Sequence, residues 1–144
     1  MPEKKKILVI QKIHQEGIKL LEHNSSYEFE IFDEINEDLK KKIVNCDAIS
    51  IRTAKLPNEI ISSAKKLQVI SRHGVGYDNI DLKSTKEIGA TLTITATANA
   101  VAVAEHVMFM LLNISKRKDM YDQSVKLGKF NDRNKLPKTL ELWG

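Results

Sequence analysis

The residues best suited to chemistry in this sequence surround two glycines near its middle. Gly74 and Gly76 follow residues 67–70, a short apolar run that predicts a buried strand, and Asp81 can cap a helix starting at Leu82. Without side chains, glycines let the backbone of such a loop approach a ligand closely. Backbone N–H groups that point at one spot form a seat for an anion. The stretch therefore predicts an anion-binding loop.

The spacing of the glycines leaves a second interpretation open. A dinucleotide-binding loop carries a third glycine (G-x-G-x-x-G), and Asn79 occupies that position here. A single G-x-G after a strand is also compatible with a tight turn that binds nothing. The weight of the motif therefore depends on the elements around it.

Strand-like and helix-like patterns alternate through the first two thirds of the chain. Strands are predicted at residues 7–10, 27–32, 48–51, 67–70 and 90–94. Helices are predicted at residues 13–22, 36–45, 57–66 and 82–88. Asn36 is expected to cap the second helix, Pro57 to occupy the first turn of the third, and Gly89 to end the fourth.

This alternation, with short connections, predicts an α/β fold: a doubly wound parallel sheet of the flavodoxin-like kind. Residues 27–32 alternate apolar and polar side chains, which is typical of a half-covered edge strand. In an open parallel sheet the loops at the carboxyl ends of the strands border the ligand crevice. The glycine stretch is one of these loops.

A different kind of segment follows. Asn99 can cap a helix over residues 100–112 that is apolar on almost every face, interrupted only by Glu105 and His106. We expect the apolar surface of such a helix to be covered by another domain or subunit. We therefore divide the chain into two parts. Residues 1–98 are the substrate domain, and residues 99–144 comprise an interdomain helix and the segment that leads into an absent domain. Residues 121–136 are mostly polar. An apolar pattern resumes at residues 139–144, and we expect that the chain is truncated there.

Composition excludes several classes of protein. The 23 Lys and Arg residues exceed the 19 Asp and Glu residues by four, and no aromatic side chains interleave with the basic ones, which argues against nucleic-acid binding. The single Cys46 excludes a disulfide framework and a thiolate metal cluster, and favours a cytoplasmic setting. No apolar run approaches the length of a membrane span.

Three stretches together resemble the D-isomer-specific 2-hydroxyacid dehydrogenases, most closely the phosphoglycerate dehydrogenase branch. They are residues 47–53 (DAISIRT), 71–81 (SRHGVGYDNID) and 99–106 (NAVAVAEH). The tail, residues 140–144 (LELWG), is similar to the segment that leads into that family's dinucleotide-binding domain. The resemblance implies an NAD-dependent enzyme in which a Rossmann domain is inserted into a flavodoxin-like substrate domain. This chain would be the first part, without the catalytic Arg, Glu and His.

The resemblance also assigns roles at the loop. Gly74, Val75 and Gly76 match the loop whose backbone N–H groups hold the substrate carboxylate, and the Val75 position lies near the nicotinamide. Arg52 matches an arginine that approaches the substrate's anionic end, which a guanidinium binds bidentately; a surface ion pair is the alternative. Arg72 is either substrate-facing or structural.

Further positions concern the cofactor. Asn99 matches an interdomain residue near substrate and cofactor, although helix capping alone would explain it, and Val103 matches a position that packs on the nicotinamide side. His106 resembles a structural histidine of the family. Ala102 stands where many members have Ser or Thr, and the segment after Arg52 is one residue shorter than the common pattern.

Two functions follow as hypotheses. In the first, the chain is the substrate-binding part of a 2-hydroxyacid dehydrogenase and is inactive alone. Its substrate is a small anionic 2-hydroxy or 2-keto acid, and it has no metal site. NAD is bound tightly only by the complete enzyme. In the second, it is a free-standing association module without catalysis. Both are compatible with a homodimer formed through the helix after Asn99. A phosphorylated receiver and a flavin binder are disfavoured because Gln11 and its neighbours provide neither an acidic pair nor a phosphate loop.

Overall fold

A computed structural model describes residues 3–142, which divide into two compact units, one ending at Thr97 and the other beginning at Ala98. The first unit is built on five strands: β1 (Lys5–Ile10), β2 (Tyr27–Phe32), β3 (Ala48–Ile51), β4 (Val69–Arg72) and β5 (Thr91–Ile94). Four helices connect them: α1 (Gln15–Glu22), α2 (Glu37–Ile43), α3 (Asn58–Ser63) and α4 (Leu82–Glu87). Strands and helices thus alternate as the sequence predicts.

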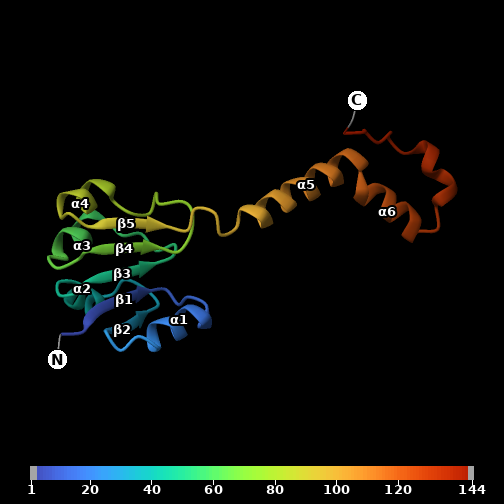
Figure 1. Cartoon of the computed structure of the whole chain (residues 1–144). Helices are drawn as coiled ribbons and strands as arrows, with labels where there is room; N and C mark the ends of the chain where they lie inside the picture. The colour runs from blue at the N-terminus through green and yellow to red at the C-terminus, as the bar shows by residue number, and fades with distance from the viewer. Residues whose placement is uncertain (1–2, 143–144) are drawn as a thin grey trace. The chain divides into compact units, whose positions relative to one another are not determined.

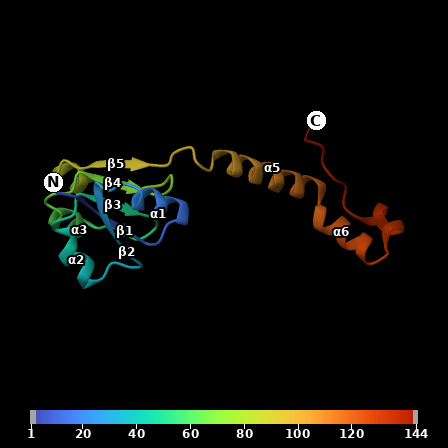
Figure 2. The same cartoon turned by 60° about the horizontal axis from the view of Figure 1, so that its bottom comes forward.

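The five strands form one sheet in the order β2-β1-β3-β4-β5, and every pairing is parallel. Figure 1 shows this order, with β2 at one edge and β5 at the other, and Figure 2 shows the sheet after a 60° turn. The flavodoxin-like, doubly wound prediction is confirmed, and so is the edge position of β2. Because all strands run in one direction, the loops that follow β1, β3, β4 and β5 lie along the same edge.

The core of this unit lies between the sheet and the helices α2, α3 and α4. Leu8 and Ile10 of β1 contribute one side of it, and Ile43 of α2 and Ile61 of α3 contribute another; all are buried. Side chains of a strand alternate between faces, so Val9 points to the opposite face, where it is buried outside that cluster, as is Ile18 of α1. The burial of three consecutive residues of β1, Leu8, Val9 and Ile10, is the signature of a sheet covered on both faces.

The caps of these helices follow the predictions in part. Asn36 Oδ1 accepts a hydrogen bond from Leu39 N at 2.9 Å, and Gly89, with φ +73°, ends α4 in the left-handed conformation that glycine adopts without strain. Pro57 is the N-cap residue of α3 and not, as predicted, a residue of its first turn. The helix ends at Ser63 rather than near residue 66. The prediction for Pro57 was therefore wrong by one residue.

The second unit consists of α5 (Ala100–Lys116), α6 (Lys118–Lys126) and a 3-10 helix, η1 (Phe130–Lys135). Arg117, with φ +50°, makes the sharp bend between α5 and α6. The following chain is tied to this bend, because Leu140 N donates to Ser115 O at 2.8 Å and Arg117 Nε donates to Lys138 O at 2.8 Å. The sequence predicted α5 but ended it too early, at residue 112, and predicted no helix at α6.

Asn99 occupies the N-cap position of α5, but its side chain makes no capping hydrogen bond with the described part of the chain. Capping therefore does not explain this asparagine, contrary to one of the two interpretations of it. None of the helices within residues 3–142 combines the length and apolarity needed to span a bilayer.

Candidate functional site

The loop that follows β4 contains a glycine in a backbone conformation that residues with a side chain rarely adopt. Gly74 has φ +149°, and a Cβ placed on it would lie 1.2 Å from Arg72 Nη1. The carbonyl of Gly74 accepts a hydrogen bond from Thr95 N at 3.0 Å, and His73 N donates to Ile51 O at 2.8 Å. The start of the loop is thus fixed to the ends of β3 and β5.

Gly76 differs from Gly74 in its surroundings. Its φ is not among the positive values, and a Cβ on it would meet only Asp78 Oδ1, at 3.2 Å. The fold of the chain itself therefore does not require a glycine at position 76. What a side chain at Gly76 would remove is open space in front of the loop.

The backbone N–H groups at the tip of this loop are free to bind a ligand. Val75, Gly76 and Tyr77 donate no hydrogen bond to any residue within 3–142, and Val75 is 44% exposed. Unpaired donors at the carboxyl edge of a parallel sheet can bind an anion without loss of an existing hydrogen bond. The carboxylate of Asp78 lies beside them, with Oδ1 3.2 Å from the position that a Cβ on Gly76 would take.

Arg72 ends β4 and folds over its own loop. Its Nη1 donates to His73 O at 3.0 Å and its guanidinium covers Gly74. Its Nε is buried and has no hydrogen-bond partner among the residues that the structure describes. This arrangement holds the Arg72 guanidinium against its own loop, and it leaves one buried donor without a partner among the described residues.

Arg52 directly follows β3 and is exposed. Its Nη1 donates to Lys12 O, after β1, at 3.1 Å, and its own carbonyl accepts from Asn79 Nδ2 at 3.4 Å. Asp and Glu are absent from these contacts, so the ion pair weighed as the alternative for Arg52 is not formed with a described residue. The structure thus places Arg52 and the Val75–Gly76 amides on neighbouring loops at one edge of the sheet.

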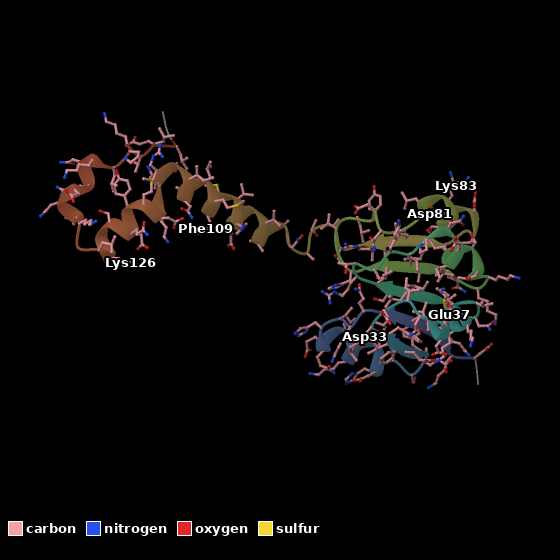
Figure 3. All side chains as sticks on the ribbon, turned by 180° about the vertical axis from the view of Figure 1, so that it is seen from behind. Asp33, Glu37, Asp81, Lys83, Phe109 and Lys126 are labelled. Carbon is pink, nitrogen blue, oxygen red and sulfur yellow. The ribbon has the colours of Figure 1, made fainter. Side chains whose placement is uncertain are left out.

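Helix α4 begins directly after this loop, and its first turn is already occupied. Asp81 Oδ1 accepts hydrogen bonds from the amide and the hydroxyl of Ser84, both at 2.7 Å, and Figure 3 labels Asp81 beside Lys83 at this turn. The hydrogen bond from the Ser84 hydroxyl, followed by that from its amide, lowers the pKa of Asp81. A phosphate has no free helix terminus here, because a carboxylate of the chain fills it.

The remaining predicted residues lie in the second unit. Asn99 precedes α5 and Val103 lies in its second turn, where Val103 N donates to Asn99 O at 2.9 Å. Both side chains are exposed. Within residues 3–142 there is no group of three His, Cys, Asp or Glu side chains that could hold a metal ion.

Two residues of this edge were missed by sequence reasoning. Gln11 and Asn79 make several hydrogen bonds between the loops, although the sequence predicted a functional role for neither of them. The one available signal was position: Gln11 directly follows the first strand, and Asn79 lies between two aspartates in the glycine stretch.

Comparison with known proteins places this arrangement in context. Residues 7–138 match the family model described as D-isomer specific 2-hydroxyacid dehydrogenase, catalytic domain. The chain is 36% identical to the chloroplastic D-3-phosphoglycerate dehydrogenase 2 of Arabidopsis thaliana, over 98% of this chain and 24% of that protein. It spans about a quarter of the length of such curated relatives.

Two solved structures have the same fold. A Pyrococcus horikoshii OT3 protein superposes with a TM-score of 0.82 and 26% identity, over 98% of this chain and 44% of that one. The 3-phosphoglycerate dehydrogenase of Entamoeba histolytica, solved with bound NAD+, superposes with a TM-score of 0.66 and 26% identity, over 78% of this chain and 40% of that one.

Proposed function

The chain belongs to the D-isomer specific 2-hydroxyacid dehydrogenase family, and we propose that it forms the substrate-binding part of an NAD-dependent enzyme of the phosphoglycerate dehydrogenase type. In this proposal residues 1–98 are the substrate domain, and residues 99–144 carry the interdomain helix. The substrate is a small 2-hydroxy or 2-keto acid, and the chain by itself is inactive.

One observation carries the proposal: the unpaired amides of Val75 and Gly76 lie at the same sheet edge as Arg52. Backbone amides can hold a carboxylate without loss of side-chain entropy, and a guanidinium can bind a second anionic group of the substrate. The open space at Gly76 lets the carboxylate approach. The buried Nε of Arg72 would complete the set only if its guanidinium turned from His73 O.

The residues of this chain do not fit a whole dinucleotide. The sequence holds a single G-x-G, and the carboxylate of Asp81 fills the helix terminus that would face a pyrophosphate. Val75, Asn99 and Val103 could border a nicotinamide, which when bound would exchange a hydride with C2 of the substrate. We therefore expect tight NAD binding only from residues outside this sequence.

A titration with oxalate tests the carboxylate site. Oxalate carries the adjacent oxygens of a 2-keto acid, and we expect it to shift the amide NMR signals of Val75 and Gly76 in a saturable way. Sulfate at equal ionic strength is the control for general anion effects. Oxalate that shifts signals elsewhere and leaves these two amides unmoved would refute the proposal.

The substitution G76A sharpens this titration. The added methyl group meets only the flexible Asp78 side chain, so the fold should persist, while the space for the ligand is lost. We expect oxalate binding to weaken at least about tenfold, the equivalent of one lost hydrogen bond to a charged group. NADH is the second probe: saturable, tight binding of NADH to this chain would show that the cofactor site has been placed wrongly.

A second candidate function is association. Most apolar side chains of α5 are exposed, including Val107, Phe109 and Ile114, and an apolar surface of that extent marks an interaction site. We propose that it forms a homodimer through α5. A dimer is compatible with a dehydrogenase, so this proposal competes with the first only if oxalate fails to bind.

A further inference from the structure

Gln11 adopts a backbone conformation that glutamine rarely takes. Its φ is +68°, in the left-handed region that costs energy for a residue with a Cβ. In return its side chain reaches the loop after β3. Gln11 Oε1 accepts hydrogen bonds from Thr53 N at 2.7 Å, from Ala54 N at 2.9 Å and from Thr53 Oγ1 at 3.1 Å. A single oxygen thereby satisfies three donors of the next loop.

The contact between these two loops is reciprocal. Arg52, one residue before Thr53, donates from Nη1 to Lys12 O, one residue after Gln11. The loops after β1 and β3 are therefore held together by hydrogen bonds in both directions. The direction of the Arg52 side chain depends on this contact, because its guanidinium is anchored to the backbone of the β1 loop.

Asn79 continues the connection from the β3 loop to the glycine loop. Its Nδ2 donates to Ala54 O at 2.7 Å, and its carbonyl accepts from Leu56 N at 2.7 Å. Leu56 O in turn accepts from Asp81 N at 3.2 Å, and Leu56 forms an isolated parallel bridge with Ile80. The backbone around Val75 and Gly76 is thus attached to the β3 loop just beyond its tip.

We propose that Gln11 and Asn79 are positioning residues, which fix the loops after β1, β3 and β4 relative to one another so that Arg52 and the Val75–Gly76 amides face the same bound anion. The inference rests on the proposed function. Neither side chain is required to contact the ligand. Each acts through the loop to which it is bound, and Ala54 is shared between them, since its N–H is held by Gln11 and its carbonyl by Asn79.

A role in fold stability alone does not account for this arrangement. The core of the unit is apolar and lies below these loops, whereas the Gln11 and Asn79 contacts lie at the partly exposed carboxyl edge. Hydrogen bonds at such a position contribute little net stability, because water can replace them. What water cannot replace is the fixed geometry of the two loops, and an anion site needs that geometry.

Substitutions in the 144-residue chain separate these roles. Q11M keeps the length of the side chain but removes the acceptor, and Q11E restores an acceptor. N79D is isosteric and removes the donor. N45D is the control, since it adds the same charge away from these loops, at an exposed asparagine before β3 whose side chain makes no hydrogen bond with a described residue.

The first readout is amide hydrogen exchange without ligand. We expect Thr53 and Ala54 to exchange on the order of tenfold faster in Q11M than in wild type, with Q11E close to wild type. Q11G tests the backbone separately: it relieves the strain at φ +68° but lacks the oxygen, so it should behave like Q11M. Exchange in Q11M equal to that of wild type would overturn the role of Gln11.

The second readout is oxalate affinity, measured well below the melting temperature. We expect dissociation constants about tenfold higher in Q11M and N79D, and unchanged within about twofold in Q11E and N45D. Lower melting temperatures with unchanged oxalate affinity would show a merely structural role and overturn the inference.

The two proposals fail in different ways. If wild type does not bind oxalate, the proposed function falls, and the positioning of an anion site falls with it, whatever the exchange rates. If wild type binds oxalate and Q11M and N79D bind it equally well, the positioning inference falls alone and the carboxylate site stands.

Discussion

Apolar side chains have opposite surroundings in the two units of this chain. In the first unit they form a core between the sheet and the helices, and all the buried apolar residues of the described chain lie between Leu8 and Ile80. In the second unit the apolar residues of α5 are exposed, and the single buried residue within 98–142 is the polar Ser115.

The difference lies in the surfaces that each unit provides. In the first unit the apolar side chains of the inner strands pack against those of the helices α2 and α3, so both sides lose contact with water together. In the second unit the partner of α5 is α6, which is short and mostly polar and cannot cover a helix that is apolar on nearly all sides (Figure 3). Hydrophobicity alone therefore does not decide burial; a second surface must be present.

The largest expected effect is a matched pair of isoleucine truncations. Ile51 is fully buried, so I51A should destabilise the first unit by about 3 kcal/mol through lost burial and a residual cavity. Ile114 is 77% exposed, and I114A should change stability by no more than about 0.5 kcal/mol at concentrations where the chain is monomeric. Urea unfolding followed by NMR signals of each unit measures both, and equal losses would break the comparison.

The second expectation concerns what covers α5. If a second copy does, F109D should place a charge in the interface and raise the dimer dissociation constant at least about thirtyfold, the cost of losing an anchoring side chain. Sedimentation of wild type and F109D measures this. The control is S124D, which adds the same charge at a polar residue of α6. A monomeric wild type at high concentration would remove the homodimer proposal and leave α5 for another domain.

A smaller effect separates two asparagines at helix starts. Asn36 caps α2 through its side chain, so N36A should cost about 1 kcal/mol, whereas N99A should cost at most a few tenths because Asn99 makes no capping bond. Thermal unfolding of the two variants tests this. A loss in N99A as large as that in N36A would mean that α5 depends on Asn99 in a way that its side-chain contacts do not explain.

The smallest effect is electrostatic and appears in acid. Burial raises the pKa of Asp47, but the hydrogen bonds from the Lys5 ammonium and the Lys6 amide outweigh it, so that pKa lies below its ordinary value. A carboxyl with a lowered pKa stabilises the fold at neutral pH and loses that contribution as pH falls, from about pH 5 downward. D47N should therefore flatten the acid side of the stability profile.

Asp122 is the comparison in the second unit. Its hydrogen bond to Lys126 likewise lowers its pKa, but the pair is exposed, so salt should screen it. The Asp47 side chain is only 15% exposed, and we expect its contribution to persist at 1 M salt, at which the Debye length is about 3 Å. Stability between pH 6 and pH 3, measured for D47N and D122N in low and high salt, decides this; equal salt sensitivity would contradict it.

The fold was predictable because local signals agreed with the tertiary structure. The apolar runs at residues 7–10 and 48–51 are strands because their neighbours on both sides are also strands. Asn36 begins a helix and Gly89 ends one, as these residue types suggest. Helix α6 escaped prediction because its residues are mostly polar and carry little periodicity. It is supported by ion pairs such as Lys126–Asp122, which a pattern of apolar residues does not register.

The candidate site was predictable at the level of its loops but not of its contacts. The glycines indicated where a strand ends and a backbone becomes accessible, and the loop after β4 is at that edge. The reach of the Gln11 side chain to Thr53 depends on the distance between segments 42 residues apart in the chain. Such contacts follow only from the assembled sheet, so no local pattern in the sequence reports them.

The topology of the sheet has a consequence for the order in which the protein can be made. Strand β1 is an inner strand that pairs with β2 and β3, so it has both partners once Ile51 has been synthesised, and the last strand is complete at Ile94. All buried apolar residues are by then available, while α5 has not yet been translated. During vectorial synthesis the first unit can therefore close before the apolar helix emerges, so that its folding does not compete with burial of α5 in the wrong core.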